Sequence, residues 1–193
     1  AEGPPDAVDA LLAFAGDGVP GERAKVEGHE QFAIRGVSAG VFVVQEHQAT
    51  AHHYDLRLEV GGVMRSWAVP KGPSLDPAQR RLAVPVEDHV LAAGEFEGVH
   101  AGATRGTGAV IVWDEGSYRP LDGSLDAGHL AFALDGSKLS GGFALTRTGP
   151  DRWIFVKMRD AEARDGSDVT AERPESVRSG RTIAEVAAPA RAP

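Results

Sequence analysis

The sequence has 193 residues, of which 42% are hydrophobic and 25% are charged, and these values exclude wholesale disorder, a collagen-like repeat and a coiled coil. A chain of this length holds one ordinary domain with tails and is too short for two full-sized domains. The formal net charge of -8 argues against a broad basic surface for nucleic acid, and the absence of cysteine excludes disulfides, zinc-thiolate sites and iron-sulfur clusters.

The predicted elements begin with an N-terminal arm, residues 1–39, which is rich in Gly, Ala, Pro and acidic residues and which we expect to be partly disordered. From 40 to 162, short runs rich in Val, Ile, Phe and Trp alternate with turn clusters, which is typical of an all-β sandwich or barrel. The runs predicted as strands are 41–47, 53–60, 63–69, 81–87, 109–114, 117–120, 130–134, 142–147 and 152–159.

Residues 163–193 mix charge with Pro, Ser and Ala, which is typical of a flexible tail or linker. Val177, Ile183 and Val186 could dock a short helix there. The chain has no stretch of about 20 apolar residues, the length that a membrane-spanning helix needs. It does not begin with the basic residues followed by an apolar segment that form a secretion signal. We therefore expect a soluble, cytoplasmic protein with no membrane partner.

Gly61 and Gly62 lie between two strand patterns and predict a tight two-residue hairpin, because such turns need positive φ at their centre. The turn sets the register of the two strands. Three residues of the first strand then face three of the second: Val60 faces Val63, Arg57 faces Ser66, and Asp55 faces Ala68. Ser66 and Ala68 are small enough to leave space above the first strand.

The strand at 53–60 has a period of two, which places His53, Asp55 and Arg57 on one face and apolar residues on the other. The loop 48–52 brings His47 back across from His53, while His52 points to the opposite face. Two imidazoles and one carboxylate with open positions suit Mn²⁺, Fe²⁺ or Zn²⁺. The pattern therefore predicts a metal site at His47, His53 and Asp55. It also predicts that Arg57 donates two hydrogen bonds to a phosphate.

Three further basic residues are candidates for the same chemistry. Lys71 leaves a rigid Pro/Gly turn, where it is either positioned for a ligand or simply exposed. His89 stands beside two carboxylates as a general acid, a base, a donor to a phosphoryl oxygen or a capping residue. The Gly-rich loop 98–108 precedes a strand and not a helix, so we interpret it as a hairpin loop from which Arg105 could reach a phosphate.

Several segments, in order, resemble the 3′-phosphoesterase domain of bacterial DNA ligase D, the end-joining ligase. The resemblance covers about residues 41–160 and is highly specific for the fold. The segments that carry it are FVVQEHQAT (42–50), HYDLRLE (53–59), SWAVPKGP (66–73), RLAV (81–84), VEDH (86–89), FEG (96–98) and VIVWD (110–114).

The resemblance implies a compact antiparallel β-barrel of about eight strands, with short flanking helices and flexible termini. It also implies a groove that binds Mn²⁺, with Zn²⁺ or Co²⁺ as other choices, and the phosphate of a nucleic-acid 3′ end. The metal ligands by motif are His47, His53 and Asp55. The residues around the scissile phosphate are Arg57, Lys71, Arg81 and His89, of which Arg57 and His89 would be catalytic.

The reaction implied is 3′-end healing in double-strand break repair: a terminal ribonucleoside is removed to leave a 3′-phosphate, which is then hydrolysed to 3′-OH. The implied partners are primer-template DNA or DNA with terminal ribonucleotides, ligase and polymerase domains, and other end-joining factors. The implied location is the nucleoid.

The sequence also departs from the family pattern. Ala93 stands where the family usually has an active-site tyrosine, Ala101, Gly102 and Arg105 replace loop residues, and residues 1–39 hold no match to the basic-aromatic N-terminal motif. Arg105 could substitute electrostatically for a lost phosphate donor. Two alternatives therefore stay open: a degenerate module that binds nucleic-acid ends or repair partners without turnover, and a non-haem iron oxygenase, which uses the same three-ligand set.

Overall fold

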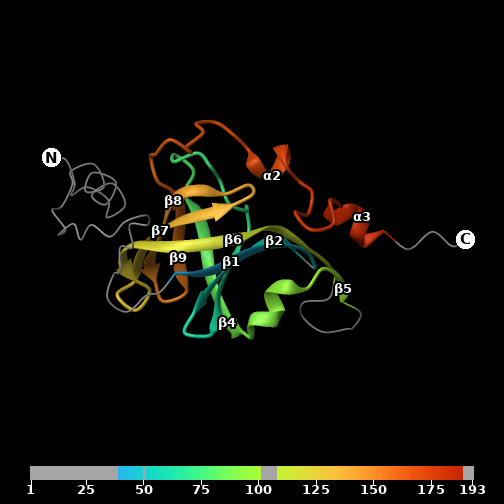
Figure 1. The fold of residues 1–193 in the computed structure, drawn as a ribbon, viewed down its shortest axis with the longest axis horizontal. Helices are drawn as coiled ribbons and strands as arrows, with labels where there is room; N and C mark the ends of the chain where they lie inside the picture. Colours follow the sequence, from blue (N-terminus) through green and yellow to red (C-terminus); the bar gives the residue numbers. More distant parts are fainter. Residues whose placement is uncertain (1–38, 50, 101–107, 189–193) are drawn as a thin grey trace, which may run out of the picture.

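The computed structural model describes residues 39–49, 51–100 and 108–188. Its strands form one antiparallel sheet in the order β1-β2-β3-β4-β9-β8-β7-β6-β5, and β1 also pairs with β6, so eight strands close into a barrel (Figure 1). The strands are β1 (Gly40–Gln48), β2 (His52–Val60), β3 (Val63–Val69), β4 (Arg81–His89), β5 (Gly98–His100), β6 (Gly108–Ser124), β7 (His129–Gly136), β8 (Ser140–Gly149) and β9 (Arg152–Lys157). The predicted barrel is confirmed.

The β2–β3 hairpin has the predicted register. Gly61 and Gly62 have φ values of 61° and 84°, a region that favours glycine, and they close the turn between the two strands. All three predicted pairs are present: Val60 with Val63, Arg57 with Ser66, and Asp55 with Ala68. The β1–β2 pairing likewise places His47 opposite His53, as predicted.

The strands differ from the prediction in the region after residue 97. The predicted strands 109–114 and 117–120 are one long strand, β6, which pairs first with β1 and then with β7. Gly116 does not break it: a Cβ there would lie 2.0 Å from the carbonyl oxygen of Asp135, so glycine permits the close approach of β7. The first three residues of the predicted hairpin loop at 98–108 form the unpredicted strand β5, which pairs antiparallel with the start of β6. Residues 101–107 of this loop lie outside the described ranges.

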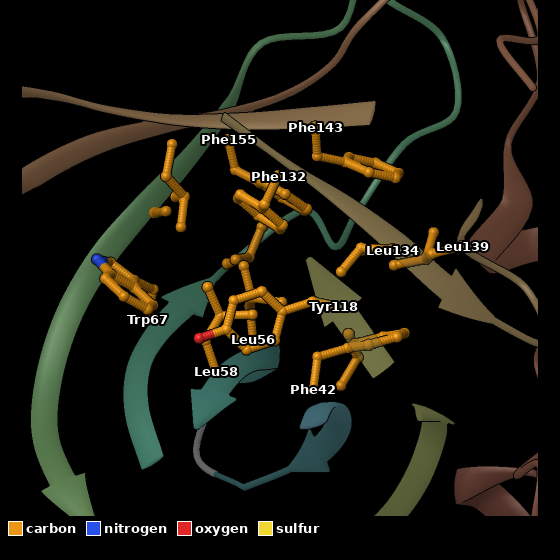
Figure 2. Close-up of a cluster of buried hydrophobic side chains, with 14 of the residues drawn as sticks. Phe42, Leu56, Leu58, Trp67, Tyr118, Phe132, Leu134, Leu139, Phe143 and Phe155 are labelled. Carbon is orange, nitrogen blue, oxygen red and sulfur yellow. The ribbon is translucent and has the colours of Figure 1, made fainter. Parts of the chain in front are cut away.

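The barrel interior is filled with large apolar side chains, as a barrel of this size allows (Figure 2). Phe132, Phe143 and Phe155 stack together, with ring centroids 5.2 to 6.5 Å apart. Leu56 and Leu58 of β2 point into this core and are almost completely buried. Because alternate residues of a strand point to opposite faces, this packing directs Asp55 and Arg57 to the outer face.

The segment 163–188, predicted as a tail or linker, packs against the barrel. It carries two short helices, α2 (Val169–Glu172) and α3 (Ile183–Ala187), and Val186 of α3 is buried against β6, which confirms the predicted docking of a helix. The buried Lys138 donates from Nζ to the carbonyl oxygens of Arg173 and Glu175. Whether this segment also serves as a linker stays a prediction.

Within the described ranges, no helix has the length and apolar character that a membrane crossing requires. The predicted N-terminal arm lies almost entirely outside those ranges. Arg105 also lies outside them, together with Ala101 and Gly102.

Candidate metal and phosphate site

Two neighbouring strands bring the three predicted metal ligands together. The rings of His47 on β1 and His53 on β2 stack with centroids 5.0 Å apart, and Asp55 lies two residues further along β2. Asp55 Oδ2 is 3.2 Å from His47 Nε2, and its Oδ1 is 3.7 Å from His53 Nε2. One ligand atom from each residue lies within 4.8 Å of the others, which is the spacing that one shared ion needs.

The protonation of the two rings suits a cation. His53 Nδ1 lies 3.0 Å from the carbonyl oxygen of Ala51, and since a carbonyl only accepts, this nitrogen carries the proton and Nε2 keeps its lone pair. His47 Nε2 is buried without a hydrogen-bond partner among the described residues. Burial lowers the pKa of His47 to about 4, so its ring is neutral at pH 7. These residues fit a divalent metal ion.

The lowered pKa of His47 makes the stability of the metal-free protein depend on pH. The folded-state pKa of about 4 lies below the ordinary value of 6.5, so the contribution of His47 is complete above pH 6.5 and is lost as the pH falls toward 4. We expect the free energy of unfolding to fall by roughly 3 kcal/mol more in this window for the wild type than for His47→Gln. Urea unfolding in EDTA measures it; identical pH slopes would contradict the assignment.

Arg57 continues the polar row of β2 and is 4% exposed. Its Nη2 donates to Asp55 Oδ2 at 2.9 Å, and its Nη1 donates to Ser66 Oγ at 2.9 Å and to His89 Nδ1 at 3.0 Å. Its Nε donates to Gln45 Oε1 at 2.8 Å. A guanidinium has five N–H donors, so one N–H of Nη2 is left for a substrate oxygen.

His89 owes its position to a bulge in β4. The register between β3 and β4 shifts so that Ser66 faces Val86 while Met64 faces His89, which inserts one extra residue into β4 and turns His89 toward Arg57. Since a guanidinium only donates, His89 Nδ1 accepts from Arg57, and the neutral ring carries its proton on Nε2. His89 therefore presents an N–H donor beside the cationic Arg57.

Sequence reasoning missed two partners of Arg57. Gln45 is 2% exposed; besides accepting from Arg57, it donates from Nε2 to the carbonyl oxygens of Ala93 and Phe96 at 3.1 and 2.9 Å. The available signal is the glutamine that directly follows the apolar run 41–44. Ser66, expected only to leave space, instead accepts from Arg57.

Of the other predicted phosphate-binding residues, the two that the structure describes, Lys71 and Arg81, make no hydrogen bond or ion pair with this cluster. Lys71 is exposed in the turn after β3 and makes no hydrogen bond or ion pair with another described residue. Arg81 pairs with Phe155 and shares the face of the buried Ala83, so it lies on the core-facing side of β4. His52, as predicted, points away from the site and contacts Glu46 Oε1 at 2.6 Å.

Comparison with known proteins agrees with these motifs. Residues 45–147 match the family described as the DNA Ligase D 3′-phosphoesterase domain. The chain is 52% identical over 165 residues to the multifunctional non-homologous end joining protein LigD of Pseudomonas aeruginosa, which covers 79% of this chain and 20% of that protein. It is 40% identical over 121 residues to the multifunctional non-homologous end joining DNA repair protein LigD of Mycobacterium tuberculosis, covering 62% of this chain and 16% of that protein.

A third relative, the multifunctional non-homologous end joining protein LigD of Mycolicibacterium smegmatis, is 40% identical over 128 residues, which is 62% of this chain and 17% of that protein. The chain thus matches a fifth or less of the length of each of these relatives. The family match spans more than half of the chain, and the motifs on β1 to β4 lie within it or beside it. The chain belongs to the DNA ligase D 3′-phosphoesterase domain family.

Proposed function

We propose that this chain is a metal-dependent phosphoesterase that heals the 3′ ends of DNA or RNA strands during end joining. The observation that carries the proposal is the set His47, His53 and Asp55 directly beside the buried Arg57 and its half-buried partner His89. The first set suits a divalent cation, and the pair offers donors to a phosphoryl group. The family of the chain supports the same chemistry.

In this proposal His47, His53 and Asp55 would hold a divalent ion, preferably Mn²⁺ and otherwise Zn²⁺ or Co²⁺, which would supply positive charge for a phosphoryl oxygen. Arg57 binds and orients a phosphoryl oxygen through its remaining N–H, and its four other hydrogen bonds hold the guanidinium in place. Water attacks phosphorus, and the bond from phosphorus to the leaving oxygen breaks: this is the 5′ oxygen of the terminal ribonucleoside in the first step and the 3′ oxygen of the strand in the second. The proton that the water loses ends, through solvent, on the leaving oxygen, and the His89 Nε2–H group donates a hydrogen bond to that oxygen.

The two steps that this chemistry serves are removal of a terminal ribonucleoside, which leaves a 3′-phosphate, and hydrolysis of that phosphate to 3′-OH. In this proposal Lys71, which follows the end of β3 that pairs with the start of β2, approaches a bound phosphate from solvent. The core-facing position of Arg81 disfavours direct contact with the scissile group. Since the relatives are multifunctional end joining proteins, we propose ligase and polymerase domains as working partners.

Release of inorganic phosphate from a 3′-phosphate primer-template tests the proposal. We expect release with Mn²⁺, a loss of at least roughly 100-fold in His47→Ala, and no loss in the control His129→Ala, whose ring bonds Thr146 away from the site. Full activity in His47→Ala would refute the metal-dependent mechanism.

Binding without hydrolysis would instead support the alternative, a non-catalytic end-binding module. Ala93 favours this alternative, because a methyl group there offers no hydroxyl to the phosphate. The iron oxygenase is disfavoured by Arg57 and His89, whose donors suit an anionic phosphoryl group.

A further inference from the structure

The barrel wall opens where β4 runs past the start of β9. The two strands pair only from Arg81 to Ala83, and the rest of β4 continues without a partner in β9. A pocket of about 200 Å³ lies in this gap, with Trp67 of β3 and Trp153 of β9 among its walls. This volume is below the usual range for whole small-molecule ligands, so the pocket suits one compact group.

One residue that lines the pocket carries a polar group without a partner among the described residues. Trp67 is 2% exposed, and its indole Nε1 is buried without a hydrogen-bond acceptor among the described residues. In Figure 2 this nitrogen points away from the phenylalanine cluster. Trp113, by contrast, donates its Nε1 to the carbonyl oxygen of Arg173 at 2.8 Å. A buried N–H donor normally has a partner, so a ligand acceptor that reaches Trp67 Nε1 would satisfy it.

Two arginines line the same pocket. The Arg147 guanidinium lies 5.8 Å from the centre of the Trp153 ring and makes no ion pair with another described residue. Arg65 Nε lies 3.2 Å from Asp88 Oδ1, and the Asp88 side chain is 49% exposed. Asp88 thus forms the ion pair with Arg65, and because its side chain is exposed it can move away into solvent. No other carboxylate lines the pocket.

We propose that this pocket binds a backbone phosphate of the nucleic-acid strand whose 3′ end lies at Arg57 and His89; the proposal rests on the proposed function. A phosphate accepts from the indole N–H of Trp67 and pairs with Arg65 and Arg147, displacing Asp88. The pocket and the site share strands β3 and β4: Asp88 precedes His89, and Ser66, which bonds Arg57, also lines the pocket. The strand is therefore held at a second point beside the reacting end.

The indole N–H resonances of the three tryptophans provide a test that does not depend on turnover. The probes are inorganic phosphate and a short oligonucleotide with a 3′-OH end, added to the ¹⁵N-labelled protein in EDTA. We expect the Trp67 indole signal, assigned with Trp67→Phe, to shift with both probes and that of Trp113 to stay in place. A shift with inorganic phosphate alone, or with neither probe, would overturn the proposal.

Substitutions then test which charged side chains of the pocket contact the phosphate. Arg147→Ala should weaken oligonucleotide binding about 10-fold and lower the dependence of log Kd on log salt by about one, the amount expected for one lost phosphate contact. Asp88→Asn should tighten binding, because it removes the competing carboxylate. The control Arg119→Ala makes the same charge change at an exposed position on β6 and should leave both quantities unchanged. Equal effects of Arg147→Ala and Arg119→Ala would refute a specific pocket.

The outcome is separable from that of the proposed function. If the oligonucleotide shifts Trp67 but no phosphate is released from 3′-phosphate ends, the pocket stands and the hydrolytic function fails. If phosphate is released while Trp67 stays unshifted, the function stands and the pocket proposal fails.

Discussion

Asp55→Asn should lower the affinity for Mn²⁺ by more than about 100-fold, which exceeds the usual effect of losing a group that only supports a ligand. Asp55 is the single carboxylate of the set, and its two oxygens face His47 and His53 at 3.2 and 3.7 Å. The amide of asparagine keeps an oxygen to accept from Arg57 Nη2 but removes the negative charge that attracts the ion. Isothermal titration with Mn²⁺ measures the effect.

A matched variant separates this effect from a general change in charge. Asp135→Asn removes the same charge from an exposed position on β7, away from both histidines, and should leave the Mn²⁺ affinity unchanged. Thermal unfolding of both variants shows whether the fold is retained. Unchanged Mn²⁺ binding in Asp55→Asn would mean that the ion, if bound, lies elsewhere.

Arg57→Met should destabilise the protein by about 3–5 kcal/mol, because it removes one partner of a buried ion pair and leaves Asp55 without its counter-charge. Gln45, Ser66 and His89 lose their shared donor in the same variant. The rate of phosphate release should fall by about 10²–10³-fold, as when one preorganised donor to a developing charge is removed. Urea unfolding and the primer-template assay measure the two effects.

A double-mutant cycle checks the cause of the destabilisation. Adding Asp55→Asn to Arg57→Met removes the unpaired charge and should restore part of the lost stability, although not the activity. Arg119→Met serves as the control for losing an exposed arginine and should change stability by less than about 0.5 kcal/mol. Strictly additive losses from Arg57 and Asp55 would show that the pair is not coupled.

The sequence was sufficient to predict the parts of the site that depend on strand parity. The alternation of residues 53–60 and the two-residue turn at 61–62 determine which side chains share a face and which residues pair, and both follow from local backbone geometry. The contact between His47 and His53 follows in the same way from the short loop at 48–52.

The features that sequence reasoning did not predict depend on contacts between distant segments. The role of Gln45 requires the carbonyl groups of Ala93 and Phe96, and nothing in its own strand indicates that they lie within reach. The core-facing side of Arg81 follows from the pairing of β4 with β9, which is remote in sequence. The continuity of β6 through Gly116 depends on the approach of β7. Parity within one strand cannot reveal such pairings.

The β1–β2 hairpin contributes all three candidate metal ligands from residues 47–55. His89, which accepts a hydrogen bond from Arg57, lies on β4 and so comes from a later part of the chain. Contacts between residues close in sequence form with the smallest loss of chain entropy. During synthesis the three proposed metal ligands are therefore all available once this hairpin has emerged, whereas the proposed phosphate-binding pair is complete only after β4 has emerged.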